Sequence, residues 1–303
     1  MKRKEFIKTS TAGIAGLSVA QLGIGGILKA FAQEGAPHVV WIENGEPEAL
    51  VQAAVAAFGG LQTFISKGDK VVIKPNIGWD RAPAYAANTN PDLVAEVVRL
   101  CLAAGARQIK VLDHSTNNAI RSYRNSQIEA KAKAAGAKIV QVREQRFRDV
   151  NLPEGKVLKS WPIYGEYLDA DKVINIPVAK HHSMCKVTLG LKNLMGAMGG
   201  NRGEIHNGFS TKLADITSHI LPTITIIDGY RIMTGNGPTG GSLADVKEAR
   251  TLIMSDCTIA ADVTGVGLFG LKPQDVGYLR EMMGRGKQKY DLDNLQVKRI
   301  SLT

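Results

Sequence analysis

Short apolar runs alternate with longer amphipathic segments along most of the chain, and this alternation predicts the fold. Four runs rich in Val or Ile have the length of buried strands. They occupy residues 38–42, 70–73, 108–112 and 138–142. Between two of them, residues 90–104 repeat apolar positions at helical spacing, with Asn90 as the expected N-cap and Pro91 in the first turn. The alternation predicts an α/β protein whose mainly parallel sheet carries helices on both faces.

The second half of the chain continues this pattern after an interruption. Residues 143–170 contain Pro153, Pro162 and short alternating pieces, which predict a small inserted β-rich lobe. The remaining expected strands occupy residues 172–176, 223–227, 252–254 and 296–302. Helices are expected at residues 47–58, 121–135, 211–221, 258–269 and 273–283. We interpret residues 33–303 as a single α/β domain that includes the lobe.

Polar residues follow five of the expected strands. They are Lys74-Pro75-Asn76, Asp113-His114-Ser115, Lys180-His181-His182, Asp228-Gly229 and Ser255-Asp256. Parallel strands bring their carboxyl ends to one edge of a sheet, where open α/β sheets bind ligands. The sequence therefore predicts one ligand site that combines residues distant along the chain.

Basic side chains and imidazoles gather between residues 172 and 206, with few acids to neutralise them. A lysine that is partly desolvated among like charges has a lowered pKa and can act as a base, and histidine exchanges protons near neutral pH. The candidate catalytic residues are Lys180, His182, Lys192 and His206. The alternative for Lys180, Lys192 and also Lys74 is structural, with a lysine paired to Asp113 or Asp228 across the edge.

Other residues at this edge are candidates for holding the ligand. They are Lys74, Asn76, Asp113, Asp228, Gly235, Asn236 and Gly237. Asn76 either orients a ligand or caps a turn. The loop at residues 235–241 has four glycines, so it either approaches a ligand closely or is a flexible connector.

Metal binding is a weaker hypothesis for the histidines. Adjacent His181 and His182 on a strand point to opposite faces, and their spacing with His206 matches no zinc pattern. We predict no metal site, and the sequence identifies no cofactor. Three cysteines without a Cys-x-x-Cys pair are too few for a disulfide scaffold, and we expect Cys101 in the core.

Charge limits the partners. The net charge is +10, of which +4 belongs to residues 1–32, leaving +6 for the remainder. This modest excess, without an aromatic and basic platform, suits a small anionic ligand and excludes a dedicated nucleic-acid binder.

Residues 1–32 have the character of an export signal. Arg3 and Lys4 precede a weakly apolar run rich in glycine, and residues 30–32 form a small-x-small cleavage motif. The pattern resembles a twin-arginine signal with lysine in place of the second arginine. We expect an exported, periplasmic or otherwise extracytoplasmic protein with no membrane span in the mature chain. An uncleaved anchor is the alternative.

Several motifs together resemble one known family. They are Lys74-Pro75-Asn76, Lys180-His181-His182, the block at residues 191–196, His206, Asp228-Gly229 and the block at residues 235–238. This ordered set is similar to domain-of-unknown-function family 362 over roughly residues 70–270. The family has no settled activity. Some members carry ferredoxin-type modules, which implies redox or cofactor chemistry, but this chain lacks the cysteines of such a module.

Three functions fit these residues. We favour an exported enzyme that acts on a small ligand bearing phosphate or carboxylate. One alternative is a non-catalytic module that binds an anion or an organic cofactor. The other is a redox accessory protein that works with an external iron–sulfur or flavin partner protein.

Overall fold

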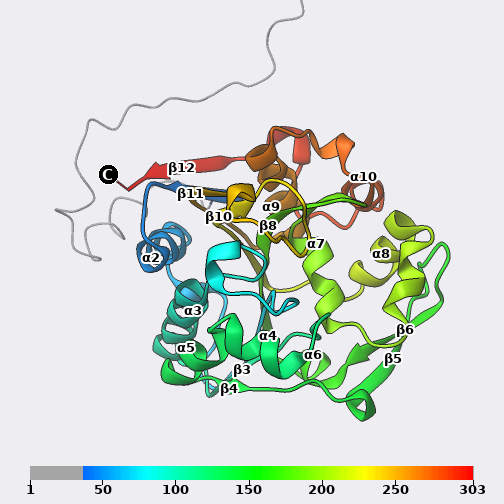
Figure 1. Ribbon diagram of the computed structural model, residues 1–303, viewed down its shortest axis with the longest axis horizontal. Helices are drawn as coiled ribbons and strands as arrows, with labels where there is room; N and C mark the ends of the chain where they lie inside the picture. The colour runs from blue at the N-terminus through cyan, green and yellow to red at the C-terminus, as the bar shows by residue number, and fades with distance from the viewer. Residues whose placement is uncertain (1–36, 303) are drawn as a thin grey trace, which may run out of the picture.

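The computed structural model describes residues 37–302, which form a mostly parallel 10-stranded sheet with helices on both faces and a separate two-stranded sheet (Figure 1). The predicted α/β class is therefore confirmed. The main path, in spatial order, is β12 (Val297–Ser301), β1 (Val39–Glu43), β11 (Val246–Ser255), β10 (Ile224–Met233), β7 (Lys172–Ile176), β2 (Lys70–Pro75), β3 (Gln108–Val111) and β4 (Lys138–Ile139). Off this path, β8 (Val178–His182) pairs with β10 and with β9 (Lys186–Thr188).

Helices cover the sheet in two layers. One layer contains α2 (Pro47–Ala57), α3 (Pro91–Ala103), α4 (Ala119–Asn125) and α5 (Ile128–Ala134). The other contains α7 (Gly190–Asn193), α8 (Phe209–Thr217), α9 (Thr258–Gly265) and α10 (Gly277–Met283). Figure 1 shows α2, α3 and α5 on one side and α7, α8 and α10 on the other. Successive strand residues enter opposite cores, as Val71 and Val72 do, because side chains alternate across a pleated sheet.

The inserted lobe is an antiparallel hairpin at the periphery. It consists of β5 (Phe147–Asn151) and β6 (Ser160–Tyr164), followed by the short helix α6 (Gly165–Leu168). Asp215 on α8 fixes the hairpin, since its carboxylate accepts hydrogen bonds of 2.8 Å from the backbone N–H groups of residues 156–158. Arg285 neutralises this buried carboxylate at 2.6 Å. The lobe is thereby tied to the helical layer.

Two local predictions are wrong. β11 runs antiparallel to both of its neighbours, so Ser255-Asp256 lies at the opposite edge from the other polar strand ends. The helix expected at residues 121–135 is two helices, because Gln127 between them has a left-handed backbone with φ of 61°. The start of α3 is as predicted, with the Asn90 side chain accepting a hydrogen bond from Asp92 N.

All three cysteines are buried free thiols, and Cys101 lies in the core as predicted. None of the helices within residues 37–302 is long and apolar enough to cross a membrane. The predicted export signal lies outside the described residues.

Candidate functional site

The chain order reverses between the neighbouring strands β2 and β7. From β2 the chain passes to β3 and β4 on one side, whereas from β7 it passes to β10 on the other. Such a switch point leaves a crevice beyond the carboxyl ends of the two central strands, where ligands bind in this class of fold. Here those ends are Lys74-Pro75-Asn76 on β2 and Ile176 on β7.

Two predicted ligand residues, Lys74 and Asp113, form a buried ion pair in this crevice. Lys74 Nζ lies 2.6 Å from Asp113 Oδ1, and the two side chains are 0% and 3% exposed. The turn at Leu194–Ala197 covers the pair so closely that a Cβ on Gly196 would lie 1.6 Å from Asp113 Oδ1. Burial lowers the pKa of Lys74, and the Asp113 charge opposes this effect. Lys74 and Asp113 therefore form the structural lysine–aspartate pair that the sequence left open as an alternative.

A chain of amide hydrogen bonds fills the rest of the crevice. Asn175 on β7 donates to Gly190 O at 3.0 Å and accepts from Asn193 Nδ2 at 2.9 Å. Asn193 Oδ1 in turn accepts from Asn76 Nδ2 at 2.9 Å. Because each bond fixes which end of the amide donates, the chain turns Asn76 Oδ1 toward Lys180, whose Nζ lies 3.2 Å away.

Lys180 is the buried cation of the site. Its side chain is 1% exposed, and Nζ donates to Ala87 O at 2.6 Å and lies 5.8 Å from the Trp79 ring centroid. Within residues 37–302 it forms no ion pair with a carboxylate. Burial lowers the pKa of Lys180 well below its ordinary value, and the charge of Lys192 lowers it further. This amine is therefore poised to lose its proton far more readily than an ordinary lysine.

His182 lies on the same face of β8 as Lys180, two residues further along. Burial, followed by the charges of Lys192, Lys180 and His206, lowers the pKa of His182 to about 3. Met184 N donates to His182 Nδ1 at 3.2 Å, so the hydrogen of the neutral ring sits on Nε2. The neutral imidazole can consequently donate one hydrogen bond to a ligand.

Lys192 and His206 complete the predicted set. Lys192 is partly buried on α7, where its Nζ lies 5.5 Å from the Phe209 ring centroid and forms no ion pair among the described residues. Burial lowers the pKa of Lys192. His206 is exposed and stacks on Phe209 with the ring centroids 6.0 Å apart. The structure brings all four candidate catalytic residues into one electrostatic neighbourhood.

Arg202 adds a cation that the sequence analysis missed. Its guanidinium donates to the carbonyls of His114 at 2.8 Å and Ser115 at 3.1 Å, and its charge lowers the pKa of Lys192. We call Lys180, His182, Lys192, Arg202 and His206 the basic cluster.

Asp228 lies on β10, the strand that pairs with β8, and the glycine loop at residues 235–241 follows β10. Asp228 accepts hydrogen bonds from Asn90 N at 2.7 Å and Tyr230 N at 3.0 Å, and burial raises its pKa to about 6. It therefore fixes the start of α3 to the middle of β10, and it pairs with no lysine among residues 37–302.

The loop contacts β8 through its backbone. Gly237 N donates to His181 Nδ1 at 3.1 Å, and a Cβ on Gly237 would lie 2.0 Å from His181 O, so only glycine fits. Asn236 instead binds Asp245 with its side chain, and Gly235 lies beside the same carboxylate. Within residues 37–302, no group of three or more His, Cys, Asp or Glu side chains is arranged to hold a metal ion.

Together these features define an α/β protein whose basic cluster, at the carboxyl edge of a mainly parallel sheet, has no carboxylate partner in the part of the chain that the structure describes. The chain belongs to the family described as Domain of unknown function (DUF362), which matches residues 71–267, more than half of its length. This match confirms the resemblance seen in the motifs.

One relative is a thylakoid-associated protein of Synechocystis sp., 28% identical over 242 residues that cover 77% of this chain and 73% of the relative. Among solved structures, the lactate racemase apoprotein from Thermoanaerobacterium thermosaccharolyticum is similar with a TM-score of 0.44 and 12% identity, over 71% of this chain and 54% of that one. A protein from Thermotoga maritima gives a TM-score of 0.38 and 11% identity, over 84% of this chain and 60% of its own. These distant likenesses assign no activity.

Proposed function

We propose that the chain binds a small ligand bearing a phosphate or carboxylate at the basic cluster, and that it exchanges a proton with this ligand. One observation carries the proposal. Lys180 and Lys192 are both withdrawn from solvent, and the Lys192 charge is close enough to Lys180 to lower its pKa. Neither lysine has a carboxylate partner among the described residues. Buried unpaired cations are costly, and a bound anion offsets that cost.

The geometry supports a distinct role for each residue. Lys192 and the Nε2–H of His182 hold the anionic group, since both donate hydrogen bonds. The Lys180 amine, which Asn76 orients, accepts the proton that the ligand releases. His206 stands at the exposed side of the cluster, and the loop from Gly235 to Gly237 covers the ligand.

Proton transfer is favoured over simple binding because of the pKa values. A binding module would need only an open basic groove with ordinary pKa values, whereas burial lowers the pKa of Lys180 well below its ordinary value. No feature of the described residues favours the redox accessory role. Native mass spectrometry with metal analysis of the purified protein tests that role directly, since a redox partner should retain a flavin, cluster or metal.

Ligand binding can be followed through Trp79, whose ring lies beside Lys180. The difference in fluorescence between the wild type and Trp79→Phe isolates this signal from Trp41 and Trp161. We expect inorganic phosphate or malonate, added at constant ionic strength, to change it saturably. Lys192→Met should weaken binding at least about tenfold, because it removes a charged hydrogen bond.

Lys186→Met is the matched control, because Lys186 is an exposed lysine close in sequence to the cluster. It should leave the affinity unchanged. The proposal fails if Lys192→Met binds the anions as tightly as the wild type. It also fails if this variant unfolds by circular dichroism, since Lys192 would then be structural.

We further propose that residues 1–32 direct export through a twin-arginine route and that the mature protein works outside the cytoplasm. The composition of this segment supports the proposal, and the thylakoid association of the Synechocystis relative agrees with a place in a membrane-enclosed compartment. Fractionation of cells that express the full chain tests it. Arg3→Gln should leave the protein in the cytoplasm, and extracytoplasmic recovery of that variant would exclude the route.

A further inference from the structure

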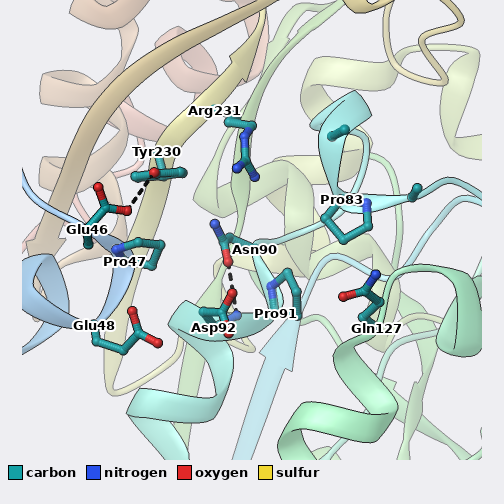
Figure 2. Close-up of a pocket in the computed structure, with 12 residues that line it drawn as sticks. Glu46, Pro47, Glu48, Pro83, Asn90, Pro91, Asp92, Gln127, Tyr230 and Arg231 are labelled. Atoms are coloured by element: carbon teal, nitrogen blue, oxygen red, sulfur yellow. Dashed lines mark hydrogen bonds between the residues drawn. The ribbon is translucent and has the colours of Figure 1, made fainter.

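A pocket that we call the proline pocket lies at the same edge of the sheet and contains no residue of the basic cluster. It has a volume of about 550 Å³. The N-terminal turns of α2 and α3, the turn at residues 82–84, and Tyr230 and Arg231 on β10 enclose it (Figure 2). Pro47, Pro83 and Pro91 with the Tyr230 ring supply apolar walls, so the pocket can hold the body of an organic molecule as well as its charged ends.

Asn90 presents an unused donor to this pocket. The side chain is only 8% exposed, and its Oδ1 accepts the capping hydrogen bond from Asp92 N at 2.9 Å. That bond fixes the orientation of the amide and leaves Nδ2 without an acceptor among residues 37–302. Figure 2 shows this nitrogen turned toward Arg231. The nitrogen is accessible from the pocket, so a ligand bound there can accept its hydrogen bond.

Arg231 provides a positive charge next to this donor. Its side chain is 33% exposed, and its ion-pair contact is Nε to Glu248 at 3.8 Å, which is beyond hydrogen-bond distance. The guanidinium lies 5.0 Å from the Tyr230 ring centroid and points into the pocket (Figure 2). A guanidinium and an amide N–H group side by side suit a carboxylate or another planar anion.

Negative charge lines a different wall. Tyr230 and Arg250 engage Glu46, and Lys131 engages Asp92, so these two carboxylates already have partners. Glu48, in the first turn of α2, has no hydrogen bond or ion pair among the described residues. The pocket therefore offers one unpaired carboxylate on the α2 wall and an anion-binding pair, Arg231 with Asn90, on another.

We propose that this pocket binds a small zwitterion, with its anionic group on Arg231 and the Asn90 amide and its cationic amino group on Glu48. A ligand of either charge alone would leave one of these charged side chains unmatched. A zwitterion satisfies both, and its hydrocarbon part contacts the prolines and the Tyr230 ring. The site is separate from the basic cluster, so the proposal stands or falls independently of the proposed function.

The test uses ω-amino acids of three to six carbons as zwitterionic probes, each with the carboxylate and the alkylamine of equal length. Isothermal titration calorimetry on the purified protein should show at least one amino acid binding about tenfold or more tightly than both matched compounds. In Glu48→Gln, the amino acid should bind no more tightly than the carboxylate of equal length. In Arg231→Gln, the amino acid should bind no more tightly than the alkylamine of equal length. Glu129→Gln, on α5 and outside the pocket lining, should leave all affinities unchanged.

Three outcomes overturn the proposal. The first is that no zwitterion binds, and the second is that a carboxylate binds as tightly as its amino acid. The third is a zwitterion preference that survives both substitutions. Thermal unfolding of each variant confirms that a lost affinity reflects the pocket and not the fold.

Discussion

The low pKa of His182 makes a quantitative prediction about stability. In the folded protein this pKa is about 3, against an ordinary value of 6.5. As the pH falls below 6.5 the unfolded chain takes up a proton on this ring, whereas the folded protein does not. The stability from keeping the ring neutral is therefore fully present above pH 6.5 and is lost as the pH falls toward 3.

The size of the effect follows from the two pKa values. Between pH 7 and pH 5, protonation of the unfolded ring lowers the free energy of unfolding by about 2 kcal/mol, at 1.36 kcal/mol per pKa unit. Asp228 and Asp262 act in the opposite direction, because burial raises their pKa values to about 6 and about 7. Comparison with a variant that lacks only the imidazole is thus needed to isolate His182.

His182→Gln is that variant, since its side-chain oxygen can still accept the hydrogen bond from Met184 N. We expect the difference in unfolding free energy, wild type minus variant, to shrink by about 2 kcal/mol from pH 7 to pH 5. Urea titrations in phosphate-free buffers measure it, because a bound anion would raise the pKa of the ring. A difference that stays constant or grows as the pH falls would refute the reasoning.

Three further substitutions test the buried groups that shape the site, each measured by urea unfolding. Gly196→Ala should lower the free energy of unfolding by at least about 2 kcal/mol, because the added Cβ would clash with the Lys74–Asp113 pair. Gly241→Ala is the control and should change it little, because no atom lies within 4 Å of the added Cβ. Asp113→Asn should cost about 3–5 kcal/mol by leaving Lys74 buried without its counter-charge, and adding Lys74→Met should recover part of that loss. Asp215→Ala should free the hairpin of the lobe, costing at least about 2 kcal/mol, and proteolysis there should accelerate.

Local periodicity was sufficient for the fold class but not for every strand direction. The parallel strands β1, β2, β3 and β7 are short apolar runs that the pattern identifies directly, whereas the parallel strand β8, which ends in Lys180-His181-His182, was not expected. β11 is different because its first residues, from Val246 to Arg250, are only partly buried or exposed, so its apolar run covers little more than Leu252–Met254. The hairpin that makes it antiparallel was therefore invisible, and Ser255-Asp256 was placed at the wrong edge.

The residues of the candidate site were also only partly predictable from the sequence. The expected strand ends placed Lys180 and Asp228 at the right edge, although Lys180 lies within β8 and Asp228 within β10. The sequence could not decide that Lys74 would pair with Asp113, because that depends on a contact between residues 39 positions apart. Asn175 had a signal that was overlooked, since an amide inside a buried strand must find hydrogen-bond partners. Arg202 gave no signal, because its position depends on how residues 194–206 fold back over the sheet.

The loop from Asn76 to Asn90 borders both proposed sites, and the way it is held predicts that the sites act independently. Its Ala87 carbonyl contacts Lys180 in the basic cluster, and its residues 82–84 and Asn90 line the proline pocket. Thr89 lies between them, 1% exposed, and its hydroxyl accepts from Asn76 N at 2.8 Å and donates to Ile176 O at 2.7 Å.

A ligand that displaces Ala87 can therefore reach Asn90 along the chain only by breaking the hydrogen bonds that hold Thr89 to Asn76 and to Ile176 of β7. We expect saturating phosphate to change the affinity for the preferred amino acid by less than about twofold, which corresponds to under 0.5 kcal/mol of coupling. Thr89→Val keeps the shape of the side chain but removes these bonds, so coupling should appear in that variant. Strong coupling in the wild type would mean that the loop moves as one body and that Thr89 does not separate the two sites.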